Sequence, residues 1–100
     1  MRNTYNLIWS DEALNNLKCI LDYLEGRWTK KEITRFVRLL DKHLLLIKEN
    51  PFLFPKSKNS TEYRKAVISK QVSLYYKISN NEIYLITLFD NRQNPQKVTR

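Results

Sequence analysis

The chain has 100 residues, of which 42% are hydrophobic and 28% charged, and its formal net charge is +8. This composition excludes a disordered chain, and the length is that of one domain, residues 1–100. No stretch approaches the ~18 apolar residues of a membrane span, and the N-terminus lacks the apolar core of a signal peptide. Cys19 is the only cysteine, which excludes an intrachain disulfide. We therefore expect a cytoplasmic domain with no membrane contact.

The positive charge is concentrated in the second half of the chain. Residues 1–50 contain nine Lys/Arg and seven Asp/Glu, whereas residues 51–100 contain nine and three. A charge excess of this kind attracts anionic partners, although many small soluble proteins are also basic. We expect an anionic partner to bind the second half.

The first elements are a strand and a helix. Alternating apolar side chains predict a short strand at residues 4–9. Ser10 is a suitable N-cap, and leucines at helical spacing predict a helix at residues 11–27. Gly26 lies near its end as a candidate C-cap.

A second helix follows after a short join. Thr29 and Glu32 have the spacing of a capping box at its start, and Asn50-Pro51 ends it. Its apolar residues extend beyond one stripe, which predicts burial on more than one side. Two helices joined so closely predict an antiparallel hairpin.

The remaining chain predicts a loop and three strands. Residues 51–55, Pro-Phe-Leu-Phe-Pro, form a rigid apolar loop. The strands are expected at residues 63–68, 72–78 and 83–89, with turns at 69–71 and 79–81. The last strand is apolar on both faces and should be central. The fold class is α+β, with the order β-α-α-β-β-β and a mainly antiparallel four-stranded sheet packed on the helix hairpin.

Candidate functional residues lie on the sheet face that the helices leave uncovered. Strand alternation places Tyr75 and Lys77 there, and one of Arg64 and Lys65 on the neighbouring strand must join them. Arg92 follows the last strand. Guanidinium groups bind phosphate, and an exposed tyrosine stacks on bases, so these residues could grip RNA. A solvated polar sheet face is the alternative.

Metal and cofactor chemistry is not expected. His43 and Cys19 are the only residues of their kinds and have no ligand-like spacing. His43 falls at the edge of the apolar face of the second helix, where a partly buried histidine is the simplest interpretation. The sequence contains no glycine-rich phosphate loop and predicts no cofactor.

Six segments, in this order, resemble the RelE/ParE superfamily of toxins from bacterial type II toxin–antitoxin systems. They are Tyr5-Asn6-Leu7-Ile8-Trp9-Ser10-Asp11-Glu12-Ala13, Asp22-Tyr23-Leu24, Asn50-Pro51 with Phe54-Pro55, Tyr63-Arg64-Lys65, Leu74-Tyr75-Tyr76-Lys77-Ile78, and Leu88-Phe89-Asp90-Asn91-Arg92-Gln93-Asn94-Pro95. Each motif is weak alone, but together they cover nearly the whole chain. The resemblance implies a toxin that inhibits growth and that belongs to a system of the kind that stabilises plasmids. A cognate antitoxin is expected to neutralise it by forming a hetero-oligomer with it.

The superfamily has two branches with different targets. RelE-like members are endoribonucleases that cut ribosome-bound mRNA, whereas ParE-like members inhibit DNA gyrase. Arg64 and Arg92 match arginine positions of the nuclease branch, and Tyr75 is a candidate catalytic residue with them, because only Asp90, Tyr75 or a lysine could stand in as the proton donor. Lys65 and Lys77 are candidate target or phosphate contacts. The tail, residues 91–100, contains no Tyr or His to protonate a leaving oxygen.

This departure favours the ParE-like branch and binding of a protein target such as DNA gyrase. A metal-independent endoribonuclease and an inactive relative remain the alternatives. The broad apolar second helix and the basic second half also suit an apolar and acidic partner, as expected of a small, partly disordered antitoxin.

Overall fold

The predicted order of elements is confirmed in a computed structural model, which describes residues 5–27, 29–57 and 62–90. The elements are β1 (Asn6–Trp9), α1 (Asp11–Glu25), α2 (Lys30–Glu49), β2 (Arg64–Val67), β3 (Val72–Ser79) and β4 (Glu82–Asp90). Their bounds differ from the predicted ones by one or two residues at most ends.

The four strands form one mixed sheet in the order β1-β4-β3-β2. β1 pairs in parallel with β4, while β2–β3 and β3–β4 are antiparallel. The prediction that the last strand is central is confirmed, because β4 lies between β1 and β3. Asn80 in the β3–β4 turn has a φ of 56°, a left-handed conformation that asparagine tolerates better than most residues.

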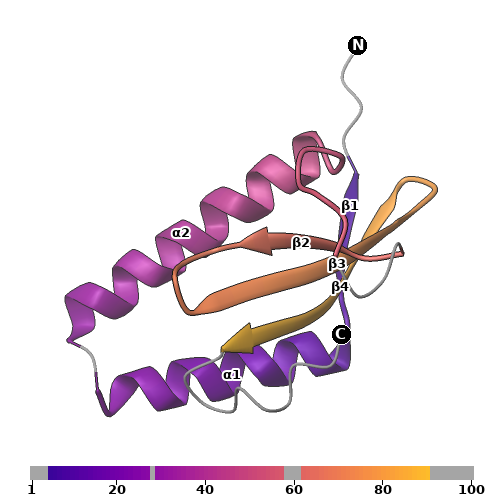
Figure 1. Cartoon of the computed structure of the whole chain (residues 1–100). Helices are drawn as coiled ribbons and strands as arrows, with labels where there is room; N and C mark the ends of the chain where they lie inside the picture. The colour runs from indigo at the N-terminus through magenta and orange to yellow at the C-terminus, as the bar shows by residue number, and fades with distance from the viewer. Residues whose placement is uncertain (1–4, 28, 58–61, 91–100) are drawn as a thin grey trace.

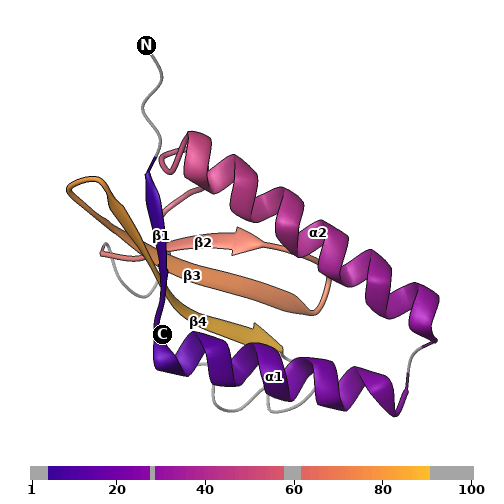
Figure 2. The ribbon, with the colours of Figure 1, turned by 180° about the vertical axis from the view of Figure 1, so that it is seen from behind.

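Both helices lie on one face of this sheet, run in opposite directions and diverge from their join (Figures 1 and 2). The Ser10 hydroxyl accepts a hydrogen bond from the Ala13 amide at 2.9 Å, which confirms the predicted N-cap of α1. The predicted capping box of α2 is also present: the Glu32 amide donates to Thr29 Oγ1 at 3.2 Å, and the Thr29 amide donates to Glu32 Oε1 at 3.0 Å. Gly26 is the C-cap of α1, with an ordinary φ of −86°.

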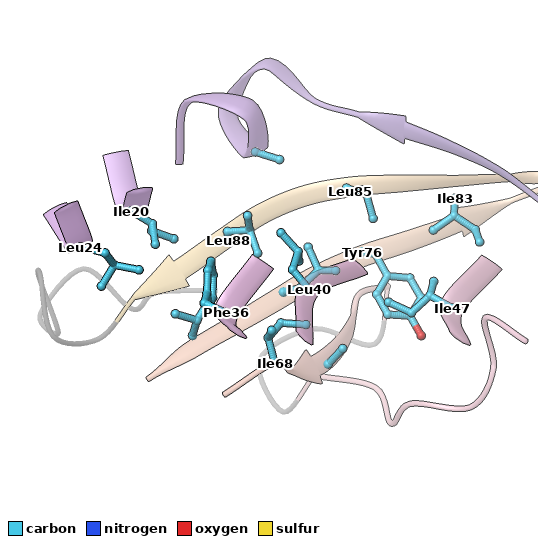
Figure 3. Packing of buried hydrophobic residues seen from close by; sticks show 14 residues of the cluster. Ile20, Leu24, Phe36, Leu40, Ile47, Ile68, Tyr76, Ile83, Leu85 and Leu88 are labelled. Atoms are coloured by element: carbon cyan, nitrogen blue, oxygen red, sulfur yellow. The ribbon is translucent and has the colours of Figure 1, made fainter. Parts of the chain in front are cut away.

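The core lies between the helices and the sheet (Figure 3). Its members share near-complete burial and are Ala13, Ile20, Leu24, Phe36, Leu40, Ile47, Ala66, Ile68, Val72, Leu74, Tyr76, Ile83, Leu85 and Leu88. The prediction that α2 is buried on more than one side is wrong within this chain. Leu45 is 59% exposed, and Val37 and Leu46 are 36% exposed, because the sheet covers only one side of the helix.

Helix α1 also protects an edge of β4. β1 pairs with β4 only as far as Leu85, and beyond that point side chains of α1 replace a strand. The Ser10 hydroxyl donates to the Ile86 carbonyl at 2.8 Å, and Asn16 Oδ1 accepts from the Leu88 amide at 3.1 Å and from the Thr87 hydroxyl at 2.6 Å. The backbone carbonyl of Ile86 and the amide of Leu88, at the edge of β4, therefore have hydrogen-bond partners without another strand. None of the helices in the described part of the chain has the length and apolarity of a membrane span.

Candidate functional site

Three of the predicted site residues share the sheet face opposite the helices. On β3, Val72, Leu74 and Tyr76 point into the core, so the alternating Tyr75 and Lys77 point away from it. Lys65 of β2 lies directly opposite Tyr75, and its Nζ is 5.9 Å from the centre of the Tyr75 ring. The predicted grouping of Lys65, Tyr75 and Lys77 on one face is therefore present in the structure.

Tyr75 is nevertheless not the exposed stacking platform that we expected. Its side chain is only 4% exposed. It lies on an interior strand, between Lys65 of β2 and Thr87 of β4, which is itself 6% exposed. A base cannot stack on a ring that is almost completely buried. The expectation of an exposed tyrosine on this face is wrong.

Arg64 lies on the other side of the sheet. It pairs with Tyr76, whose side chain is in the core, so Lys65 and not Arg64 is the cation that faces away from the helices. One guanidinium nitrogen of Arg64 donates to the Phe54 carbonyl at 2.6 Å. Its Cζ lies 5.2 Å from the centre of the Phe52 ring, within the range of a cation–π contact. Arg64 thus holds the loop of residues 51–55.

Tyr76 holds the same loop from the core side. Its ring is fully buried (Figure 3), and its hydroxyl donates to the Pro51 carbonyl at 2.6 Å. Burial raises the pKa of Tyr76 to about 12, against the opposing influence of the Arg64 charge and of a backbone hydrogen bond at Phe54. The hydroxyl therefore remains protonated at neutral pH. It serves as a fixed hydrogen-bond donor and not as a proton carrier.

The anchored loop presents two apolar side chains to solvent. Phe52 is 58% exposed and Leu53 is 53% exposed, and we call these two residues the 52–53 tip. An aromatic and an aliphatic residue displayed on a fixed loop are typical of a protein contact surface.

His43 is separate from the Lys65–Tyr75–Lys77 face. His43 lies on α2, with Nδ1 at 2.8 Å from the Leu39 carbonyl and its ring 6.0 Å from that of Phe54. It is the partly buried helix histidine that the sequence predicts.

Arg92 lies outside the described residues. In the part of the chain that the structure describes, no three His, Cys, Asp or Glu side chains are grouped to hold a metal ion.

Sequence reasoning did not find Asn16 or the anchoring contacts of Arg64. Asn16 is a polar residue inside a helix, and nothing in its sequence neighbourhood distinguishes it from the exposed Asn15. The direction of Arg64 required the register between β2 and β3, which fixes the side of the sheet on which each residue lies. The sequence places the Arg64-Lys65 and Tyr75-Tyr76 motifs on neighbouring predicted strands, but it does not say which residue of one motif lies opposite which residue of the other.

The helix pair on one face of a four-stranded mixed sheet is an arrangement that this chain shares with small toxins of type II toxin–antitoxin systems. The sequence profile of one family, described as "ParE toxin of type II toxin-antitoxin system, parDE", matches residues 7–95. The chain therefore belongs to the ParE toxin family and is a type II toxin. A search among proteins of curated function finds no match.

Solved structures with the same fold come from several bacterial toxins. The chain is similar to a chain of the chromosomal ParDE system of P. aeruginosa, with a TM-score of 0.74, 12% identity, and coverage of 88% of this chain and 97% of that one. It is also similar to a YoeB/ParE toxin from Agrobacterium tumefaciens, with a TM-score of 0.62, 14% identity and coverage of 85% and 96%. A chain of the E. coli DinJ–YafQ complex has a TM-score of 0.56, 15% identity and coverage of 90% and 97%. At these identities the likeness establishes the fold.

Proposed function

We propose that this toxin inhibits growth by binding a protein target, with DNA gyrase as the candidate, and that a cognate antitoxin neutralises it. The 52–53 tip is the observation that carries the proposal. Phe52 and Leu53 are more than half exposed although Arg64 and Tyr76 both fix their loop. A preorganised aromatic residue loses little conformational entropy on binding and is a frequent anchor of protein interfaces.

The chemistry of the sheet face opposite the helices supports the same choice. Phosphodiester cleavage by a 2′-hydroxyl needs a group that moves protons at neutral pH. Tyr75 lies beside Lys65 and Lys77 but is only 4% exposed, and Arg64 is directed to the loop on the other side of the sheet, so neither offers a free side chain to a substrate on this face. The tail, residues 91–100, contains neither His nor Tyr.

Exposed leucines of α2 support an antitoxin partner. Leu45 and Leu46 remain exposed on this helix, and one structure of similar fold contains the E. coli toxin YafQ in complex with DinJ. An antitoxin segment that covered these side chains would bury apolar surface that this chain alone leaves in water. The expected assembly is a hetero-oligomer of toxin and antitoxin.

The 52–53 tip can be tested by comparing Phe52→Ala with Val67→Ala. Val67 is 55% exposed on β2, so its truncation removes an exposed apolar side chain away from the tip. Each variant would be expressed without antitoxin to score growth inhibition, and would be purified to measure inhibition of supercoiling by DNA gyrase. We expect Phe52→Ala to weaken both effects about tenfold or more, because truncating an aromatic anchor costs about 2 kcal/mol or more of binding free energy. Equal activity of the two variants would remove the tip from the target contact.

A further inference from the structure

The 52–53 tip is part of a tight turn, and both of its backbone amides are bonded to one residue, Asn50. The Leu53 amide donates to the Asn50 carbonyl at 3.1 Å, which closes a turn of residues 50–53. The Phe52 amide donates to Oδ1, the side-chain oxygen of Asn50, at 3.3 Å. Asparagine at the first position of such a turn and proline at the second, as in Asn50-Pro51, favour this conformation. The backbone of the tip is therefore fixed by residues next to it in the sequence.

Asn50 also joins the tip to the end of α2. It is the C-cap of that helix, and its own amide donates to the Leu46 carbonyl at 2.9 Å. Its φ of −148° and ψ of 85° turn the chain out of the helical path. Pro51 cannot continue the helix, and its ring holds φ at about −65°. The turn that displays Phe52 therefore starts from a fixed point on α2.

The contacts of Asn50 complement those of Arg64 and Tyr76. These two side chains donate to the carbonyls of Phe54 and Pro51, on either side of the tip, whereas Asn50 binds the amides of the tip itself. Asn50 is exposed, whereas Tyr76 is fully buried in the core. Truncating the Asn50 side chain should therefore loosen the tip without opening a cavity in the core.

We infer that Asn50 is a positioning residue, which holds Phe52 in the conformation that binds the target without itself touching the target. This inference rests on the proposed function, in which Phe52 anchors the target contact. An aromatic side chain that is ordered before binding loses less conformational entropy, and ordering one side chain on binding weakens the affinity about threefold to tenfold. The bond to the Phe52 amide uses the side-chain oxygen of Asn50 and not its nitrogen. Aspartate can therefore replace Asn50 in this role, and alanine cannot.

The test compares full-length variants: Asn50→Ala, Asn50→Asp, Phe52→Ala and the double variant Asn50→Ala/Phe52→Ala. Asn15→Ala is the matched control, since it removes an exposed asparagine side chain from α1. Two quantities are measured for each variant: the concentration that half-inhibits supercoiling by DNA gyrase, and the protection of the Phe52 amide from hydrogen exchange. Urea unfolding verifies that each variant folds.

We expect Asn50→Ala to raise the half-inhibitory concentration about threefold to tenfold and to lower the protection of the Phe52 amide. Asn50→Asp and Asn15→Ala should stay within about twofold of the unmodified protein in both measurements, because both keep an acceptor for the Phe52 amide. If Asn50 acts through Phe52, its truncation has little left to change once Phe52 is alanine. The double variant should therefore inhibit gyrase within about twofold of Phe52→Ala.

Three outcomes would overturn the inference and leave the proposed function standing. The first is a loss of inhibition in Phe52→Ala with none in Asn50→Ala. The second is an equal loss in Asn50→Asp and Asn50→Ala while the Phe52 amide of Asn50→Asp stays protected, because the side chain would then contact the target directly. The third is a further threefold to tenfold loss in the double variant, which would show that Asn50 acts independently of Phe52. Full inhibition by Phe52→Ala would instead overturn the proposed function, and this inference with it.

Discussion

Arg64 and Tyr76 lie opposite each other on β2 and β3, and both donate hydrogen bonds to carbonyls of the same loop. Arg64 reaches the Phe54 carbonyl at 2.6 Å and Tyr76 reaches the Pro51 carbonyl at 2.6 Å. One cross-strand pair thus holds both ends of the segment that displays Phe52 and Leu53. Arg64, which the family resemblance marks as a site residue, therefore hydrogen-bonds to the loop of residues 51–55 in this structure.

Replacing Arg64 should therefore destabilise the protein. A hydrogen bond from a charged group contributes about 1.5–3 kcal/mol, so we expect Arg64→Ala to lower the free energy of unfolding by about that amount. Lys65→Ala is the matched control, because Lys65 is the adjacent cation on the opposite side of the sheet, and it should change stability by less than about 0.5 kcal/mol. Urea unfolding measures both. Equal stability of the two variants would show that the loop does not depend on Arg64.

The buried Tyr76 hydroxyl predicts a loss of stability at high pH. Its pKa is raised to about 12 in the folded protein, so above pH 10 the unfolded chain loses this proton while the folded chain keeps it. The contribution of Tyr76 to the free energy of unfolding is complete below pH 10 and is lost as the pH rises to 12. At 1.36 kcal/mol per pKa unit, the loss is about 2–3 kcal/mol. Tyr76→Phe has no such proton, so its stability should fall less over this range. The prediction would be contradicted if the unfolding free energies of the unmodified protein and of Tyr76→Phe changed with pH in parallel.

Asn16→Ala should weaken the protected edge of β4. The variant leaves the Leu88 amide and the Thr87 hydroxyl without their common acceptor, and an unpaired donor that is shielded from water costs about 1–3 kcal/mol. Asn15→Ala, one residue earlier and exposed, is the control and should be nearly neutral. Hydrogen exchange at the Leu88 amide reports directly on the contact. An exchange rate in Asn16→Ala that matches that in Asn15→Ala would refute this role.

Gly26 can be replaced without strain. Its φ is −86°, and a Cβ added there would meet the Tyr23 carbonyl oxygen at 3.9 Å, an ordinary contact distance. Gly26→Ala should therefore stabilise the protein by about 0.4–1 kcal/mol, because alanine restricts the unfolded chain more than glycine does. The midpoint of thermal unfolding should rise. A lower midpoint would show that this position needs glycine after all.

Local signals in the sequence predicted most of the fold. The cap residues Ser10 and Thr29, the alternation along β3 and the two apolar faces of β4 each depend on neighbours within a few positions. The parallel pairing of β1 with β4 joins residues more than seventy positions apart and left no local signal.

The candidate site was harder to predict, for the same reason. Alternation placed Tyr75 on the correct face, but its burial follows from contacts distant in sequence that alternation does not report. The choice between Arg64 and Lys65 depended on register, since a shift of one residue exchanges the two faces.

Whether this toxin acts on a protein target can be decided by expressing it without antitoxin and mapping both RNA ends and DNA breaks in the same cells. We expect DNA breaks to accumulate with no new mRNA ends, and no cleavage when the purified protein is mixed with mRNA or with ribosomes carrying mRNA. Metal-independent cleavage of mRNA that is abolished by Tyr75→Phe or by Lys77→Ala would contradict it. That result would assign proton transfer to the sheet face opposite the helices.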